Sequence, residues 1–429
     1  MGRRQSASEH SRIEPSGALS VESFRSVAEG IERTVRLRDG STITSEILGG
    51  RDGRRIGRAV DIDEADRAFL RMTTAPLAAS EEDPVRVVDL FSGCGGITLG
   101  VSEAARAVGR SCEVRLAVDF EPIATTVFAK NFPGTRVETA DVRQFLPGTH
   151  GDRLVDVEKR VRKRVGEVDL LVGGPPCQGH SDLNNRTRRS DAKNELYLSM
   201  VRAAEVFEPS HILIENVPGA LNDRSQVVQR SMSALDRLGY QVNCDVVDMA
   251  RIGVPQRRKR LIVLASRSAS VDLSRLYELH GVRERGVRWA ISDLISTPAD
   301  SLLNQPARSA PDTLKRIQYL FENELWELPN SERPPCHSSG AHSYNSIYGR
   351  LRWDAPSQTI TTGFYSMCMG RYVHPSERRT ITAHEAARLQ YFPDFFDFSS
   401  VTKRSEIARL IGNAVPMKLS YVIALELFR

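Results

Sequence analysis

The spacing of apolar and polar residues changes along the chain and divides it into parts. Residues 1–20 are polar and low in aromatic side chains, and we expect them to be disordered. The stretch "TVRLRDGSTITSEI" alternates apolar with polar residues around Asp39-Gly40, which predicts a β-hairpin, and "DEADRAFLRM" predicts a short helix. We group residues 1–80 as an N-terminal extension, partly disordered, with no identifiable chemistry.

From residue 84 onwards, short apolar runs alternate with segments of helical periodicity. The runs that predict strands are "VRVVDL", "VRLAVDF", "VDLLVGG", "HILIENV" and "RLIVLAS", while "GITLGVSEAARAV" and "PIATTVFAKNF" predict helices between them. This alternation favours an α/β fold with a doubly wound parallel sheet over residues 84–266. Because ligands bind at the carboxyl ends of such strands, we expect functional residues directly after them.

The regular rhythm is lost over residues 267–375, which are rich in Pro, Ser, Asn and Arg. We interpret this stretch as a second, smaller and less regular domain. Within residues 376–429, "TAHEAARLQYF" and "AVPMKLSYVIALEL" predict helices, and we expect the last helix to return to the first domain. A chain of 429 residues is long enough for one large and one small domain.

Composition narrows the class of protein. The six cysteines lie far apart, without a C-x-x-C pair or zinc-ligand spacing, so we expect neither a metal site nor a disulfide framework. No apolar stretch approaches the roughly 20 residues of a membrane span, and the first residues lack the apolar region of a signal peptide. We therefore expect a soluble, cytoplasmic protein without membrane contact. The formal net charge of +5 permits a polyanionic partner but does not require one.

The stretch "VRVVDLFSGCGGITLG" predicts a buried strand, a glycine-rich turn and a helix. Gly93, Gly95 and Gly96 allow the backbone to turn tightly beneath a ligand at the helix N-terminus. The third glycine of the dinucleotide pattern G-x-G-x-x-G would fall at Thr98. A nicotinamide-dependent oxidoreductase therefore fits poorly.

Acidic residues stand at the ends of the next two predicted strands. Asp119 and Glu121 in "VRLAVDFEP" are suited to accept hydrogen bonds from ribose hydroxyls, and Asp141 in "ETADVRQF" from an adenine amine. Each acid alone fits better as a helix cap or a solvated loop residue than as a ligand contact. Together they favour an adenosine-containing cofactor.

Cys177 follows "VDLLVGGPP" on a turn that the prolines stiffen and the glycines keep open for a flat ligand. An isolated cysteine is commonly a small core residue, but the polar "QGHSD" around it argues against burial. Cations nearby favour the thiolate, which is a nucleophile.

Two further stretches carry polar residues at the expected edge of the sheet. Glu215 and Asn216 end "HILIENV", where a carboxyl group needs a partner, so structural capping and ligand contact both stay open. The run "QRRKR" directly precedes the strand "RLIVLAS". A basic run commonly forms a solvated face, but this one leads into a core strand and so lies near the functional edge.

The ordered set of motifs resembles the DNA (cytosine-5)-methyltransferase family, whose members depend on S-adenosylmethionine. The motifs are "DLFSGCGG", "VDFEP", "ADVRQ", "GGPPCQGHS", "ENVPG", "QRRKR", "RLRWDAPSQTITTG", "HEAARLQYFPDFF" and "GNAVP", and they cover about residues 85–429. The resemblance implies a Rossmann-like methyltransferase sheet and a target-recognition domain within residues 267–375.

The resemblance also implies how S-adenosylmethionine would be held. Phe91 and Phe120 would pack on the adenine, Asp119 would hold the ribose, Asp141 would take the adenine amine, and the backbone of residues 93–96 would hold the methionine part. Further positions that match the cofactor pocket are Cys94, Val142, Pro175, Leu196, Asn413 and Ala414.

For catalysis, the resemblance implies that Cys177 adds to C6 of a cytosine flipped out of double-stranded DNA, and that Glu215 reads the base and protonates N3. Arg258 and Arg260 match the basic pair near the target base. The loop "SDLNNRTRR" would close over the DNA, with its arginines on phosphates. The implied DNA contacts are Gln178, Ser181, Arg186, Arg188, Arg189 and Gln256.

Two departures from the family pattern and two alternatives accompany this hypothesis. Asp119 stands where glutamate is usual, which shortens the ribose contact, and His180 stands where phenylalanine is frequent and is assigned no catalysis. The short variable region includes "HSSGAHSYNSIYGR", which has side chains for bases or phosphates but does not reveal a recognition sequence.

A tRNA cytosine-5 methyltransferase with the same catalytic set is the main alternative. A nucleic-acid-binding protein on an inactive scaffold is disfavoured because Cys177 and Glu215 are both present. We expect a monomer, associated with the nucleoid, that protects DNA in restriction-modification or phage defence.

Overall fold

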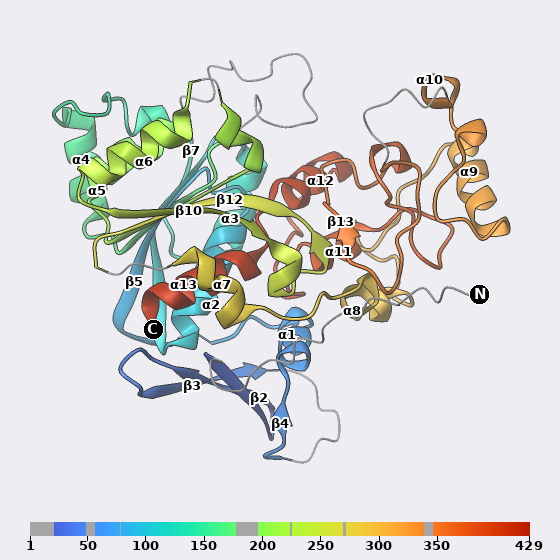
Figure 1. The fold of residues 1–429 in the computed structure, drawn as a ribbon, viewed down its shortest axis with the longest axis horizontal. Helices are drawn as coiled ribbons and strands as arrows, with labels where there is room; N and C mark the ends of the chain where they lie inside the picture. The colour runs from blue at the N-terminus through green and yellow to red at the C-terminus, as the bar shows by residue number, and fades with distance from the viewer. Residues whose placement is uncertain are drawn as a thin grey trace, which may run out of the picture.

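The structure is a computed structural model of the chain that describes residues 21–48, 56–77, 79–176, 196–223, 225–268, 272–338 and 346–429. Figure 1 shows three parts: a large sheet flanked by helices, a less regular part beside it, and a small antiparallel sheet below them. The disorder expected for residues 1–20 concerns residues outside this description.

The large part is built on a seven-stranded sheet. Five strands match the apolar runs of the sequence: β5 (Ser80–Leu90), β6 (Arg110–Asp119), β8 (Leu170–Gly173), β9 (His211–Asn216) and β12 (Lys259–Ser266). Two edge strands, β7 (Val137–Thr139) and β10 (Gln241–Asp248), complete the order β10-β12-β9-β8-β5-β6-β7. The predicted α/β fold class is confirmed.

The strands β7, β6, β5, β8 and β9 run parallel to their neighbours, but β12 does not. It is antiparallel to both β9 and β10, with Leu261 opposite Asn216. The expectation of an all-parallel sheet is therefore wrong for β12, because an apolar run predicts a buried strand without its direction. As a consequence, the start of β12 and not its end lies beside the carboxyl end of β9.

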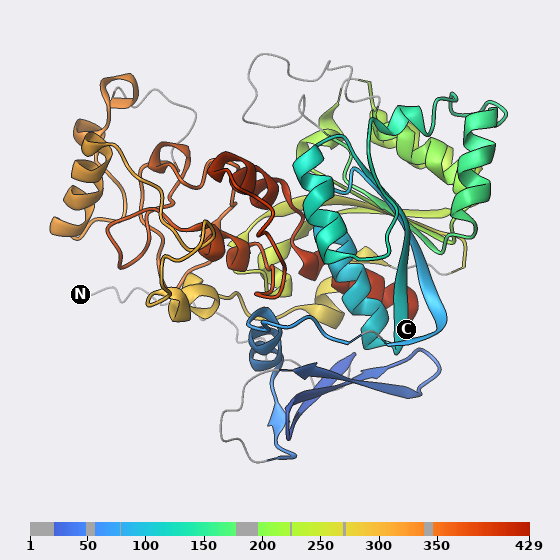
Figure 2. The same cartoon turned by 180° about the vertical axis from the view of Figure 1, so that it is seen from behind.

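Helices cover both faces of this sheet (Figures 1 and 2). One face carries α2 (Gly96–Ala107), α3 (Pro122–Asn131) and α13 (Met417–Phe428), and the other carries α4 (Asp156–Val165), α5 (Leu198–Phe207) and α6 (Val227–Arg237). The last helix packs closely along α2, since a Cβ at Gly100 would lie 2.2 Å from the Met417 carbonyl oxygen. Two apolar clusters form the core, and the one on the face of α2, α3 and α13 continues into the N-terminal residues and the less regular part.

Residues Arg404–Phe428, which comprise α12 (Arg404–Asn413) and α13, are long and apolar enough to cross a membrane. An apolar stretch of this length was not expected from the sequence. Within the most apolar window, 83% of the residues are buried inside the protein. This burial is typical of a core helix.

The less regular part contains short helices joined by long loops. Its helices are α8 (Val287–Ile291), α9 (Pro311–Glu322) and α10 (Pro335–Ser338), and α11 (Ala383–Leu389) and α12 lie between it and the large sheet. A two-stranded parallel ladder of β11 (Gln256–Arg257) and β13 (Ser357–Gln358) joins the two parts. A small apolar cluster that includes Ile317, Leu320 and Val373 forms its own core.

The N-terminal extension is an ordered module over most of its described length. It consists of β1 (Glu22–Val27), β2 (Gly30–Arg36), β3 (Thr42–Leu48), β4 (Ala59–Val60) and α1 (Ile62–Leu70), with the sheet order β3-β2-β1-β4. The hairpin predicted at Asp39-Gly40 and the predicted short helix are both present. The module lies below the main sheet, at the end from which β5 rises (Figure 1).

Candidate active site

The turn between β5 and α2 has the backbone that the glycine pattern predicts. Phe91, Gly93 and Gly95 have φ values of 59°, 54° and 99°, in the left-handed region that favours glycine. A Cβ at Gly95 would lie 2.3 Å from the Phe132 ring, whereas a Cβ at Gly93 would meet no described atom within 4 Å. The turn therefore presents open backbone at Gly93, next to the N-terminus of α2.

The Asp119 carboxylate at the end of β6 holds this turn. One oxygen accepts a hydrogen bond from the Gly93 N–H and the other from the Glu121 N–H, both at 2.9 Å. Burial raises the pKa of Asp119. The adjacent Phe120 is 64% exposed, although aromatic side chains are usually buried at least in part. A carboxylate and an exposed aromatic ring thus lie next to each other at this strand end.

The other two acids predicted to bind an adenosine also have protein partners. Asp141 precedes the short helix η1 (Val142–Gln144), and its carboxylate accepts hydrogen bonds from the backbone and the guanidinium of Arg143. The hydrogen bond from the Arg143 side chain lowers the pKa of Asp141. Glu121 forms an ion pair of 2.7 Å with Arg409 of α12. All three acids lie at the ends of β6 and β7, as the sequence predicts.

Glu215 and Arg260 form an ion pair where β9 and β12 meet. The Arg260 Nε lies 2.7 Å from the Glu215 Oε1, and the two side chains are only 15% and 11% exposed. Gly174 leaves room for this carboxylate, because a Cβ there would approach the second oxygen to 3.3 Å. Asn216 donates a hydrogen bond of 3.3 Å to the Pro175 carbonyl and so ties the end of β9 to the Pro-Pro turn.

Arg258 and Gln256 lie in the interior of the structure. The resemblance implies a place near the target base for Arg258 and a DNA contact for Gln256. Arg258 is 2% exposed and donates to the carbonyls of Ile360 and Ala414, both at 3.1 Å. Gln256 is fully buried, accepts from the Ile360 N–H at 2.8 Å and donates to the Gln390 side chain at 2.9 Å. Burial lowers the pKa of Arg258. Both side chains join the segment that leads from β11 into β12 to distant parts of the chain. Of their polar atoms, only the Arg258 Nε has no hydrogen-bond partner among the described residues.

The remaining predicted cofactor residues differ in accessibility. Cys94 is buried, its sulfur lies 4.0 Å from the Leu410 carbonyl oxygen, and burial raises its pKa to about 12. Asn413 is exposed at the end of α12, and Ala414 follows it half-buried. Val142 is buried and Leu196 packs against the core.

The predicted residues that lie outside the described ranges are Cys177, Gln178, His180, Ser181, Arg186, Arg188 and Arg189.

Asp89 is a buried acid that the sequence analysis missed. It lies in β5 directly before the glycine turn, is fully buried, and accepts a hydrogen bond of 2.5 Å from the Thr98 hydroxyl of α2. Its other oxygen has no hydrogen-bond partner among the residues that the structure describes. Burial raises its pKa to about 7. A lone acid inside an apolar run was the signal that could have identified it.

Three side chains of the variable region "HSSGAHSYNSIYGR", those of His337, Tyr348 and Arg350, make contacts within the smaller part, whereas Ser338 and Ser346 are exposed. The Tyr348 hydroxyl and the His337 Nδ1 are hydrogen-bonded at 2.7 Å. The Arg350 guanidinium lies over the rings of Phe321 and Trp326, at 3.9 and 4.6 Å from their centroids. These contacts fix the tertiary structure around residues 346–350.

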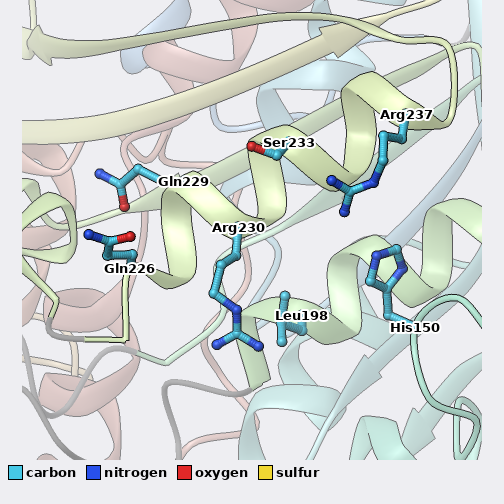
Figure 3. Close-up of a pocket in the computed structure, with 7 residues that line it drawn as sticks. All are labelled: His150, Leu198, Gln226, Gln229, Arg230, Ser233 and Arg237. Carbon is cyan, nitrogen blue, oxygen red and sulfur yellow. The ribbon is translucent and has the colours of Figure 1, made fainter.

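A cavity of about 290 Å³ opens beside α6 (Figure 3). It contains none of the strand-end residues described above, and it is therefore not the candidate active site. Its lining residues are His150, Leu198, Gln226, Gln229, Arg230, Ser233 and Arg237.

Known proteins share both the sequence and the fold. Residues 85–429 match the sequence profile of the C-5 cytosine-specific DNA methylase family. The type II methyltransferase M1.BsuMI of Bacillus subtilis (strain 168) is 40% identical over 412 residues, which cover 96% of each chain. The type II methylase M.HgiDII of Herpetosiphon aurantiacus is 30% identical and covers 80% of this chain and 95% of its own.

Solved structures agree with this sequence similarity. A putative DNA modification methyltransferase encoded within an E. coli prophage is 25% identical with a TM-score of 0.56, covering 80% of this chain and 98% of its own. The S. pombe Dnmt2 methyltransferase, at 18% identity and a TM-score of 0.57, shares the fold. Members of the matched family use S-adenosylmethionine. The chain therefore belongs to the C-5 cytosine-specific DNA methylase family and is a DNA cytosine-5 methyltransferase.

Proposed function

We propose that this enzyme transfers a methyl group from S-adenosylmethionine to C5 of a cytosine that is flipped out of double-stranded DNA at one short sequence. The observation that carries the proposal is the Glu215–Arg260 ion pair, held at the carboxyl end of the sheet next to the Pro-Pro turn. A largely buried carboxylate at this edge, fixed in orientation by an arginine, is suited to hold the polar edge of a base.

The strand-end residues fit the proposed methyl donor. The open backbone at Gly93, the Asp119 carboxylate and the exposed Phe120 ring provide room, a ribose acceptor and an apolar face within one short region. Phe91 and Asp141 complete the set of residues that would hold the adenosine. When bound, S-adenosylmethionine supplies an electrophilic sulfonium methyl group.

The chemistry requires a nucleophile and an acid, because C5 of cytosine is itself a poor nucleophile. We assign the nucleophile to Cys177, whose thiolate forms a bond to C6, and the acid to Glu215, which donates a proton at N3. C5 then has enamine character and can attack the sulfonium methyl group, and S-adenosylhomocysteine would leave as the sulfur–methyl bond breaks. Loss of the C5 proton to a base, return of the N3 proton to Glu215 and elimination of the thiolate restore the aromatic ring and release the enzyme. Arg260 orients the Glu215 carboxylate throughout.

DNA binding is assigned to the loop of residues 181–189, to Gln178 shortly before it, and to the smaller domain, residues 267–375. The arginines 186, 188 and 189 would contact phosphates, and Gln178 and Ser181 would lie near the extruded base. Because C6 is inaccessible inside a duplex, extrusion of the cytosine precedes the chemistry, and contacts in the pocket must offset its cost of a few kcal/mol.

We further propose that methylation marks the host's own DNA within a restriction-modification system and that the enzyme acts as a monomer on the nucleoid. Two of the similar proteins are named type II methyltransferase or type II methylase, which supports this role.

Substitution of the C5 hydrogen by fluorine provides the test. Once C5 carries both the methyl group and fluorine, no C5 proton can be lost, so the Cys177–C6 bond should persist. With S-adenosylmethionine present, duplex DNA that contains 5-fluorocytosine should therefore form a complex with the enzyme that survives denaturation. The variant Cys177→Ser should form none while it still binds S-adenosylmethionine, and Glu215→Gln should form it much more slowly. A persistent complex in Cys177→Ser would refute the nucleophile, and a complex on tRNA but not on DNA would refute the substrate.

A further inference from the structure

The N-terminal module is an addition to the family fold. The family profile begins at residue 85, and the prophage methyltransferase matches over 98% of its own length but only 80% of this chain. By contrast, the match to M1.BsuMI covers 96% of both chains. The shared methyltransferase fold thus exists without such a module, which raises the question of what residues 21–77 contribute here.

The module is anchored on the catalytic part through a buried arginine. Arg33 of β2 is 2% exposed, and one nitrogen of its guanidinium lies 2.9 Å from the Glu103 carboxylate of α2 and 3.0 Å from the Tyr421 hydroxyl of α13. Tyr421 in turn donates to Glu22 of β1. Since a buried charge needs partners, these contacts fix the small sheet against α2 and α13.

A second contact runs from α1 to the start of the smaller domain. Arg285, just before α8, is 2% exposed and lies between two carboxylates of α1, at 2.6 Å from Asp63 and 2.8 Å from Asp66. The same guanidinium donates to the Gly253 carbonyl at 3.1 Å and to the Tyr391 hydroxyl at 3.2 Å. Arg285 therefore joins the module, the catalytic part and the C-terminal segment at one point.

Asp66 extends this contact to the last helix. Its second oxygen accepts from the Lys418 ammonium at 2.7 Å, and Lys418 is itself 3% exposed on α13. One aspartate of α1 thus holds a cation from the smaller domain and a cation from the catalytic part. At the other end of α1, Arg71 lies 2.7 Å from Asp293, which follows α8.

We propose that α1 is a clasp, formed by Asp63 and Asp66, that sets the position of the smaller domain relative to the catalytic domain and so promotes binding of DNA between them. The module itself lies at the amino end of the parallel strands, whereas the candidate active site lies at their carboxyl ends (Figure 1). Asp63 and Asp66 are positioning residues that act through Arg285 and Lys418. The inference rests on the proposed DNA-binding role of residues 267–375.

The test compares the double variant Asp63→Asn/Asp66→Asn with the wild type, as full-length chains. We expect the KM for DNA to rise about tenfold, a typical coupling between separate sites, while the affinity for S-adenosylmethionine and kcat at saturating DNA change less than about twofold. Without DNA, small-angle scattering of the double variant should show a wider distribution of shapes than that of the wild type, because its smaller domain is less constrained.

Two control variants separate positioning from general stability. Glu64→Gln removes an acid of the same helix whose ion pair with Arg58 stays within the module, and it should leave the KM for DNA unchanged. Ile31→Ala weakens the apolar cluster beneath the module and removes none of the charged groups of the clasp, and it should lower the melting temperature while DNA and S-adenosylmethionine remain bound as in the wild type.

The clasp is refuted if the double variant keeps both the KM for DNA and the scattering profile of the wild type, or if its affinities for DNA and S-adenosylmethionine fall together. Failure of the wild type to bind DNA would refute the proposed function instead. The scattering comparison needs no DNA and decides the clasp in that case as well.

Discussion

Replacing Asp89 with asparagine should change how the stability of the enzyme depends on pH. Burial raises the pKa of this carboxyl group from 3.8 to about 7, and the nearby Asp119 adds to the increase, against the hydrogen bond from Thr98. Between these two pH values the folded chain keeps a proton that the unfolded chain has lost. Stability must therefore fall as the pH rises through this window, and above about pH 7 the loss stays constant.

The size of the effect follows from the width of the window. The interval from 3.8 to about 7, at about 1.4 kcal/mol for each pH unit, corresponds to a contribution of about 4 kcal/mol. Asparagine has a similar shape, can still accept the hydrogen bond from Thr98, and does not titrate. The difference in the free energy of unfolding between Asp89→Asn and the wild type should therefore change in favour of the variant, by about 2–3 kcal/mol, as the pH rises from 5 to 7.

Urea denaturation of both proteins at several pH values measures this difference. Asp354→Asn is the matched control, since the Asp354 side chain is 90% exposed, and its difference from the wild type should not vary over the same range. A difference between Asp89→Asn and the wild type that stays constant from pH 5 to pH 7 would refute the assignment of a protonated carboxyl group at this position.

Three further substitutions test the site itself. Asp119→Ala should weaken S-adenosylmethionine binding about 10- to 100-fold, since a hydrogen bond to a charged group contributes about 1.5–3 kcal/mol. An unchanged affinity in calorimetry would contradict the assignment of Asp119 to the ribose. Arg260→Ala should lower the free energy of unfolding by about 3 kcal/mol, because it leaves the largely buried Glu215 carboxylate without this partner. Arg260→Lys should recover part of the loss. Equal stability of the wild type and both variants in urea would argue against the ion pair. Cys177→Ser should abolish methyl transfer in a tritium assay and keep cofactor affinity, and full turnover would contradict its assignment as nucleophile.

The sequence predicts five of the seven strands of the large sheet because each of these five is a short apolar run between turns, whereas the edge strands β7 and β10 are not apolar runs. The sequence does not reveal the direction of each strand. β12 resembles its parallel neighbours in sequence, and its antiparallel pairing depends on β10, which precedes it and forms a hairpin with it. This pairing has a functional consequence, since it places Arg260 and not the end of β12 beside Glu215. The basic run was predicted to lie near the functional edge, and Arg260 does lie there. It does so because β12 is antiparallel to β9, which the sequence did not reveal.

The side chains of the basic run show a second limit of sequence reasoning. Arg257 and Lys259 are exposed, whereas Gln256 and Arg258 are buried, an alternation that follows the period of two of a strand. Their buried hydrogen bonds go to segments more than 100 residues away, such as Ile360. The sequence identifies the polar groups but does not reveal these distant partners.

The N-terminal module illustrates the same limit on a larger scale. Alternation around the Asp39-Gly40 turn is a local signal and predicts the hairpin correctly. Attachment of the module depends on Arg33 and on the clasp at Asp66, whose partners come from α2, α13 and the segment before α8. Contacts between such distant segments leave no periodic pattern in the sequence.

The most direct test of the proposed activity is methylation of unmodified DNA. The purified enzyme is incubated with tritiated S-adenosylmethionine and double-stranded genomic DNA that lacks cytosine methylation, and 5-methylcytosine is then mapped at base resolution. We predict label on DNA, with 5-methylcytosine at one recurring short sequence. Absence of label on DNA, or transfer to tRNA in its place, would contradict the proposal that this enzyme modifies double-stranded DNA at a specific site.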